Sequence, residues 1–454
     1  MQSKKIVRFV IAAPAVVLST IAFYSYTHKA SSFDTGIKKV NHVVVIYMEN
    51  HSFDNLYGQF DGADGITNAK KENIIQLDAS GAPYATLPQL NGGAIPNGLP
   101  NDNFNIDQYV HSDKETSDVT HEYYREQKQI NGGLMNKYVQ FNNSAGLTMG
   151  YYKTSMLPLF AMAQKYTLCD HFFHSAFGGS YLNHQWLIAS ATPVNPDAPD
   201  DIKAKLDASG NEVKDGSVTP DNYVVNTSFS VNSPRPPANW YNSNTKRLVP
   251  NQTNPTIGDR LSEKGVSWAW YSGGWDSAMA GHPDKNFQYH HQPFIYYANF
   301  ADGTPAKKQH LKDETEFLAA AKNGTLPAVS FVKPLGADNE HPGYSNVMRG
   351  EQHALELINA VLNGPDGKDA VVILTYDENG GFWDHVAPPA IDKKWGPGTR
   401  IPAIVMSPFA KKGHVDHTQY ETVSILAFIE KRWGLKPLAT RDAQAKPLTN
   451  AFDF

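Results

Sequence analysis

The chain has 454 residues, of which 41% are hydrophobic and 19% charged, and its formal net charge is −5 at pH 7. This composition is typical of a globular protein and excludes fibrous and disordered chains. Lys and Arg form no run beyond the N-terminus. We therefore expect no nucleic-acid partner, because such a partner would require a basic face.

The N-terminal segment predicts export. A few basic residues precede an apolar stretch from Phe9 to about Tyr24, and the small residue Ala30 stands near a possible cleavage site, as in a signal peptide. Residues 1–30 could instead stay attached as a membrane anchor, or form a buried helix. With either a signal peptide or an anchor, the rest of the chain would lie in the periplasm or at the cell surface. Cys169 is the single cysteine, so no intramolecular disulfide can form.

Strand and helix patterns alternate along the remaining chain. Apolar runs predict buried strands at residues 42–48, 267–271 (the weakest), 328–333, 369–376 and 402–407, mostly parallel to one another. Amphipathic spacing predicts helices at residues 154–166, 352–363 and 419–433. The alternation is typical of an α/β fold with a doubly wound, mostly parallel central sheet flanked by helices. We expect a single domain over residues 38–454, with a loop-rich insertion at 192–260, where Pro, Asn, Asp and Ser are frequent and no periodicity is visible.

Two of these strands end in oxygen-bearing side chains. Glu49 and Asn50 follow the first strand, and Asp377 and Glu378 follow the strand that ends at residue 376. In open α/β sheets, ligands bind beyond the carboxyl ends of the strands. We therefore expect these four hard donors to meet and hold one divalent metal ion, whose identity the pattern does not give. The alternative is that the acidic residues are only helix caps.

A candidate nucleophile follows a glycine turn. Gly178 and Gly179 precede Ser180, and an apolar stretch, QWLIAS, begins at residue 185. Such a turn at the start of a helix exposes a hydroxyl and directs backbone N–H groups toward an anion. Ser180 is therefore expected to attack a phosphorus centre. The alternative is that it is only the N-cap of the helix.

Histidines are the third element of the predicted site. His290, His291 and His341 lie close to prolines in predicted loops, where functional residues concentrate. We expect them to hold the phosphoryl group or to protonate the leaving oxygen, although each could be only a hydrogen-bonded structural residue. We expect His341 to be the acid, because the preceding Asp338 and Glu340 could raise its pKa.

Together, these segments resemble the bacterial acid phosphatase and phospholipase C (phosphoesterase) family of the alkaline phosphatase superfamily. The resemblance covers residues 40–435 and rests on VVVIYMENHSFDNLYG, FGGSYLNH, HHQPF, the His-Pro at 341–342 and TYDENGGFWDHV, in that order. It implies an alkaline-phosphatase-like fold, a phosphate-ester substrate, and Ser180 as both nucleophile and metal contact. It implies the remaining metal ligands as Glu49, Asn50, Asp377 and Glu378. It also implies substrate contact by His121, which stands ten residues before an Asn-Gly-Gly, and more weakly by His111.

The expected reaction is metal-dependent hydrolysis of phosphoric esters through a phosphoserine. The segment HVDHTQYETVSILAFIEKRWGL resembles the acid-phosphatase branch, which favours a broad-specificity acid phosphatase. An acidic pH optimum follows if histidines protonate the leaving group. The alternatives are a phospholipase C that cleaves phospholipid diesters, for which a membrane anchor would be useful, and a metal-stabilised binding protein without activity.

Overall fold

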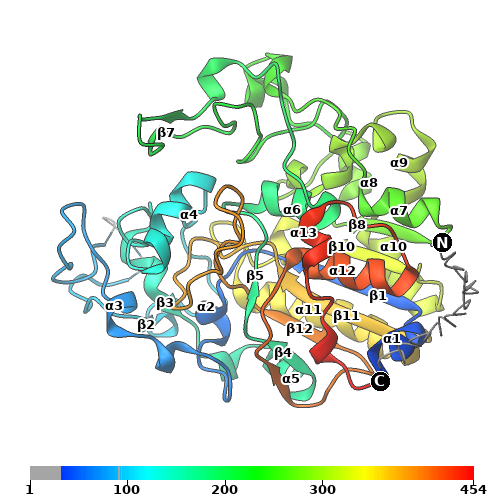
Figure 1. Ribbon diagram of the computed structural model, residues 1–454, viewed down its shortest axis with the longest axis horizontal. Helices are drawn as coiled ribbons and strands as arrows, with labels where there is room; N and C mark the ends of the chain where they lie inside the picture. The colour runs from blue at the N-terminus through cyan, green and yellow to red at the C-terminus, as the bar shows by residue number, and fades with distance from the viewer. Residues whose placement is uncertain (1–31, 90–92, 94) are drawn as a thin grey trace, which may run out of the picture.

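The computed structural model of the chain (Figure 1) describes residues 32–89, 93 and 95–454. The predicted export segment, residues 1–30, therefore lies outside the described residues. Within the described part of the chain, no helix is both long and apolar enough to cross a membrane.

A central eight-stranded sheet organises the molecule. In spatial order its strands are β13 (His414–Asp416), β4 (Thr167–Cys169), β12 (Ala403–Met406), β11 (Ala370–Tyr376), β1 (His42–Met48), β10 (Val329–Lys333), β8 (Trp268–Ser272) and β9 (Leu311–Asp313). Only β12 among these strands runs opposite to its neighbours. The mostly parallel sheet is thus confirmed, and all five predicted strands are present within one residue of their expected bounds.

The register of the two central strands positions the candidate site. Met48, the last residue of β1, is level with Tyr376, the last residue of β11. Both strands are buried over nearly their whole length, which explains their uninterrupted apolar sequences, because helices cover both faces of such sheets. Glu49 and Asp377 consequently leave the sheet side by side.

Helices flank this sheet (Figure 1). Among them are α6 (Ser180–Ala189), α7 (Ile257–Glu263), α10 (Glu314–Asn323), α11 (Val347–Leu362) and α12 (Thr422–Trp433). α6 packs against α12 and α7, and α10 packs against α11. The other helices are α1 (Ser32–Gly36), α2 (Phe53–Tyr57), α3 (Lys71–Ile74), α4 (Tyr123–Ile130), α5 (Phe160–Lys165), α8 (Trp275–Met279), α9 (Pro305–His310) and α13 (Thr440–Gln444). Short strands outside the sheet are β2 (Phe104–Asn105), β3 (Gly150–Tyr151), β5 (Phe172–Phe173), β6 (Lys205–Leu206), β7 (Glu212–Lys214) and β14 (Tyr420–Glu421).

One predicted helix is wrong in extent. Residues 154–166 form a 3-10 turn, Thr154–Met156, and then the separate helix α5. Pro158 lies between them; it has no N–H to donate and disfavours helical geometry at Leu157. The other two predicted helices are present as α11 and α12, with α12 beginning at Thr422 after the short strand β14.

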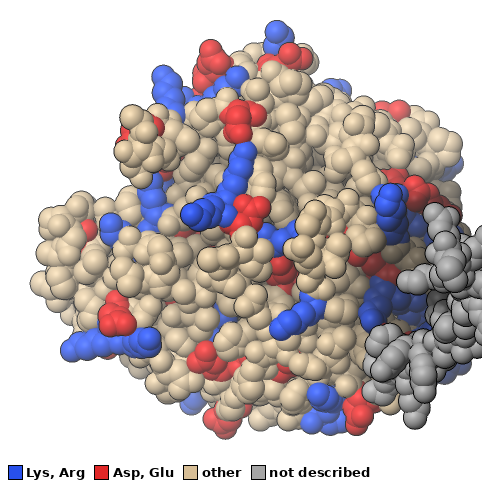
Figure 2. Space-filling view, in the orientation of Figure 1, with Lys and Arg blue, Asp and Glu red and all other residues tan. Residues whose placement is uncertain are grey.

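The loop-rich insertion lies above the sheet, where Figure 1 shows it in green at the top. Until α7 begins at Ile257 it holds only 3-10 turns and the β6–β7 hairpin. One hydrophobic core contains residues from Ile37 to Phe452. On this basis we propose that residues 38–454 form the single expected domain. On the face drawn in Figure 2, acidic and basic side chains of the described residues are interspersed without a continuous basic patch.

Candidate active site

The predicted metal ligands meet at the carboxyl ends of β1 and β11. Glu49, Asn50, Asp377 and Glu378 are all fully buried. Ser180 Oγ donates a hydrogen bond to Glu49 Oε2 at 3.0 Å and lies 3.5 Å from Glu378 Oε1, while Asn50 Nδ2 donates to the same Glu378 oxygen at 2.8 Å. Asp377 interacts with Glu49 and Glu378, so the structure brings together all five side chains that the sequence predicted as metal ligands.

A glycine turn presents Ser180 at the start of α6. Gly179 occupies the N-cap position and Ser180 is the first helical residue, so the interpretation of Ser180 as only an N-cap is wrong. Gly178 has φ +88°, and a Cβ there would lie 2.6 Å from the backbone of Tyr123. A side chain at Gly179 would meet the His121 ring at 2.9 Å. Glycine is thus required at both positions for the turn to pack against Tyr123 and His121 and to begin the helix at Ser180.

The donor set fits a cation. Among the described residues, no group hydrogen-bonds to the buried acceptors Asn50 Oδ1 and Asp377 Oδ2, although buried polar atoms are normally paired. Burial raises the pKa of Asp377 well above its usual range, and repulsion from Glu49 adds to the effect. Several carboxylates crowded into one buried space favour a positive ion between them. Carboxylate and amide oxygens are suitable ligands for a hard divalent cation.

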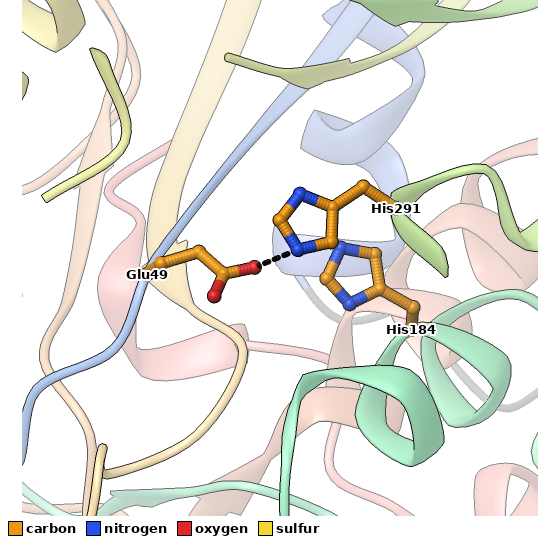
Figure 3. A group of neighbouring side chains, drawn as sticks. All are labelled: Glu49, His184 and His291. Atoms are coloured by element: carbon orange, nitrogen blue, oxygen red, sulfur yellow. Dashed lines mark ion pairs between the residues drawn. The ribbon is translucent and has the colours of Figure 1, made fainter. Parts of the chain in front are cut away.

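Two histidines and Glu49 form a second group of side chains that could ligate a metal ion (Figure 3). His291 Nε2 lies 2.7 Å from Glu49 Oε1. The His184 ring stacks on the His291 ring, with centroids 5.0 Å apart and an interplanar angle of 5°. His184 Nδ1 lies 2.7 Å from the carbonyl oxygen of Ser180, one turn earlier on α6. Nitrogen donors therefore adjoin the oxygen donors, with Glu49 common to both groups.

A buried lysine completes the charge pattern. Lys333, the last residue of β10, has its Nζ 2.6 Å from Glu49 Oε1 and 5.4 Å from the Tyr47 ring centroid. Burial alone would raise the pKa of Glu49, but His291 and Lys333 outweigh burial and lower it well below its usual range. The Lys333 contact to Oε1 is an ion pair by distance, and no hydrogen bond from the described residues reaches Oε1 with regular geometry. Oε1 is therefore held by the charge of Lys333 rather than by directional bonds.

Four of the five predicted substrate-contacting and acid histidines gather around Ser180. His341 Nε2 is 3.8 Å from Glu49 Oε2, and its ring is 5.6 Å from the His121 ring. His121 Nε2 is 3.8 Å from Glu378 Oε1. His290 joins the cluster through His291, at 4.4 Å between ring centroids. His111 does not join it, since it lies on an exposed turn and no contact within the described chain connects its side chain to the cluster.

The prediction that Asp338 and Glu340 raise the pKa of His341 is wrong. Burial lowers the pKa of His341 despite the nearby Glu49. Its acidic sequence neighbours point elsewhere, because Asp338 accepts a hydrogen bond from Arg349 at 2.7 Å and Glu340 accepts one from the hydroxyl of Tyr376 at 2.9 Å. Adjacency in sequence therefore does not place either carboxylate against the imidazole.

His121 is the histidine of the cluster whose pKa is raised. Burial opposes its protonation, but Glu378, Asp118 and Glu122 outweigh burial and raise the pKa to about 9. Burial lowers the pKa of His291 to about 4, so that ring is neutral at pH 7. His121 also lines a cavity of about 430 Å³ that reaches Gly179, next to the nucleophile. The imidazole with the raised pKa thus lies at this cavity.

The model of the phosphoesterase family matches residues 40–436. The chain belongs to the phosphoesterase family. It is similar to a non-hemolytic phospholipase C of Pseudomonas aeruginosa, with 25% identity over 92% of this chain and 58% of that protein. It is also similar to phospholipase C B of Mycobacterium tuberculosis, with 23% identity over 91% of this chain and 78% of that protein.

The chain thus spans little more than half the length of the Pseudomonas relative. Among solved structures, a protein of the alkaline phosphatase superfamily from Vibrio parahaemolyticus aligns with a TM-score of 0.35 and 11% identity, over 65% of this chain and 67% of that one.

Two residues of this phosphoesterase site, Lys333 and His184, were not predicted from the sequence. Lys333 ends a predicted buried strand, so a charge at the carboxyl end of that strand was a usable signal. His184 follows Ser180 by four residues, a spacing that puts both side chains on one face of a helix. Both contacts depend on which strand neighbours β1 and on which helix carries the serine.

Proposed function

We propose that this chain hydrolyses phosphoric esters through a phosphoserine formed on Ser180. The observation that carries the proposal is the placement of the Ser180 hydroxyl at the first position of α6, in contact with the buried carboxylates of Glu49 and Glu378. A merely structural serine would not need a glycine turn, a histidine and two acidic side chains around it. The N–H groups in the first turn of α6 favour an anion at the same point.

Glu49, Asn50, Ser180, Asp377 and Glu378 would hold the divalent ion. When bound, such an ion lowers the pKa of a coordinated hydroxyl and neutralises charge on a phosphoryl oxygen. This role is a proposal supported by the unpaired buried oxygens of Asn50 and Asp377.

The side chains themselves provide for the proton of the nucleophile. Ser180 Oγ already donates to Glu49 Oε2 at 3.0 Å. Glu49 can therefore accept the proton as the bond from Oγ to phosphorus forms and the bond from phosphorus to the ester oxygen breaks. The charge of Lys333 keeps Glu49 ionised for this role.

His121 is our candidate for the acid that protonates the leaving alcohol. It lines the solvent-connected cavity, whereas His341 does not border that cavity. His290, His291 and His341 are then proposed to surround the phosphoryl oxygens. Burial lowers the pKa of all three histidines, which suits neutral imidazoles that donate a single hydrogen bond.

A substrate panel tests the function. Purified protein would be assayed with an alkyl phosphate monoester and with a phosphatidylcholine analogue, beside the Ser180→Ala variant. Turnover of either ester that depends on Ser180 supports the proposal, and no turnover of any phosphoric ester contradicts it. Faster turnover of the monoester would support an acid phosphatase. Faster turnover of the diester would support a phospholipase C, which the names of the relatives favour.

Export through residues 1–30 also remains a proposal, together with a periplasmic or surface location and membrane attachment. Cell fractionation of the full chain, compared with a chain that begins at residue 31, tests it. Recovery of both in the cytoplasmic fraction would contradict export.

A further inference from the structure

The cavity beside Ser180 is acidic. Asp118, Glu122 and Asp215 line it together with His121 and Gly179, and its volume is about 430 Å³. The described residues that line it include no Lys and no Arg. Because Gly179 precedes Ser180 and lines this cavity, we assign the space to the alcohol of a substrate whose phosphoryl group reaches Ser180.

The three carboxylates come from two separate segments. Asp118 and Glu122 flank His121, and Asp118 Oδ1 lies 3.9 Å from His121 Nδ1. Asp215 belongs to the loop-rich insertion. Burial raises the pKa of Asp215 to about 6, and Glu122 and Glu212 add to the effect. Glu122 and Asp215 are therefore close enough to repel each other, and a cation between them would relieve that repulsion.

The imidazolium of His121 offsets part of the charge of Asp118 and Glu122, but the basic side chains on α4 do not neutralise the remaining negative charge. Arg125 and Lys128 on α4 both pair with Glu212, at 3.1 Å and 2.9 Å. The Glu212 side chain is only 2% exposed, so these pairs hold both cations at the hairpin instead of in the cavity. Arg125 offsets the charge at Asp215 only in part.

The chemistry of the lining distinguishes between kinds of cation. Quaternary ammonium groups are typically recognised by aromatic side chains, and the described lining of this cavity contains no Phe, Tyr or Trp. A primary ammonium group instead has three N–H donors for carboxylate acceptors. An anionic alcohol would meet three like charges.

We propose that Asp118, Glu122 and Asp215 make this site selective for phosphoric esters whose alcohol carries a primary ammonium group. Esters of neutral, quaternary or anionic alcohols of the same length are poorer substrates. The inference rests on the proposed function, because it assigns the cavity to the alcohol that leaves from phosphorus.

The test uses four phosphate monoesters with three-carbon alcohols that end in an ammonium, a methyl, a trimethylammonium or a carboxylate group. We expect kcat/KM to be highest for the ammonium ester. In Asp215→Asn and Glu122→Gln the ratio of kcat/KM for the ammonium ester to that for the methyl ester should fall by about tenfold, as expected for loss of a partly buried charge. The ratio cancels any effect on the phosphoryl chemistry, including one transmitted through His121.

Asp207→Asn is the matched control. Asp207 lies on the exposed turn of the same insertion, outside the cavity, and its replacement should leave the ratio unchanged. A ratio of kcat/KM for the ammonium ester to that for the methyl ester near one in the unaltered protein would overturn the inference. So would a ratio in Asp215→Asn and Glu122→Gln equal to that in Asp207→Asn.

A binding measurement separates this inference from the proposed function. The four phosphonate analogues, which cannot be hydrolysed, would be titrated into the protein by calorimetry. If no ester is turned over but the ammonium phosphonate binds about tenfold more tightly than the methyl one, the function fails and the selectivity holds. Equal binding of the two would refute the selectivity.

Discussion

Replacement of Lys333 by Met tests how charge is balanced around Glu49. The change removes a buried cation 2.6 Å from Glu49 Oε1 and keeps a side chain of similar length. Removing one partner of a buried ion pair typically costs about 3–5 kcal/mol. His291, at 2.7 Å from the same oxygen, could take over part of the role, because Lys333 is among the groups that hold its pKa down at about 4. We therefore expect a loss near 3 kcal/mol in the metal-free protein at pH 7.

Urea unfolding monitored by tryptophan fluorescence would measure this loss in the presence of a chelator. With a saturating divalent ion the difference from the unaltered protein should shrink, since the ion supplies the positive charge that Glu49 has lost. Lys312→Met is the control, because Lys312 pairs with Glu316 at the surface and should contribute less than about 1 kcal/mol. A Lys333→Met loss no larger than that of the control, or a difference that persists with the ion, would refute the reasoning.

Three further predictions concern the metal, the pH dependence of stability and the acid. Asp377→Asn should lower bound metal and turnover together in elemental analysis and assays, and normal values of both would contradict a ligand role. Burial raises the pKa of Glu351 to about 8, so its contribution to stability is present below the unfolded pKa of about 4.3 and is lost as the pH rises toward 8. Glu351→Gln should therefore flatten the decline of the melting temperature between pH 5 and 8, and an unchanged slope would be evidence against this assignment. His121→Gln should reduce kcat/KM for an alkyl phosphate more than for a nitrophenyl phosphate, by roughly a hundredfold, whereas equal losses would point to another acid.

The sheet and the oxygen donors could be predicted because their signals are local. A strand buried on both faces is apolar along its length, and Glu49 and Asp377 interrupt that pattern where the strands end. Parallel strands then place both residues at one edge without further information. The short strands β4, β9 and β13 have only three residues each, too few for a recognisable pattern.

The electrostatics of the site could not be predicted from sequence neighbours. Glu340 has φ +80°, an unusual conformation for a residue with a side chain, and its carboxyl group bonds to Tyr376 instead of facing His341. His121 acquires its raised pKa partly from Glu378, which lies more than two hundred residues away in sequence. The role of Lys333 likewise depends on β10 lying next to β1.

The most direct test of the account is to identify the residue that becomes phosphorylated. The protein would be mixed with a nitrophenyl phosphate, quenched in acid within one turnover, digested and mapped by mass spectrometry. The account predicts phosphate on Ser180, and a loss of several orders of magnitude in turnover for a folded Ser180→Ala variant. Phosphate on another residue, or more than about one per cent of normal activity in Ser180→Ala, would contradict it.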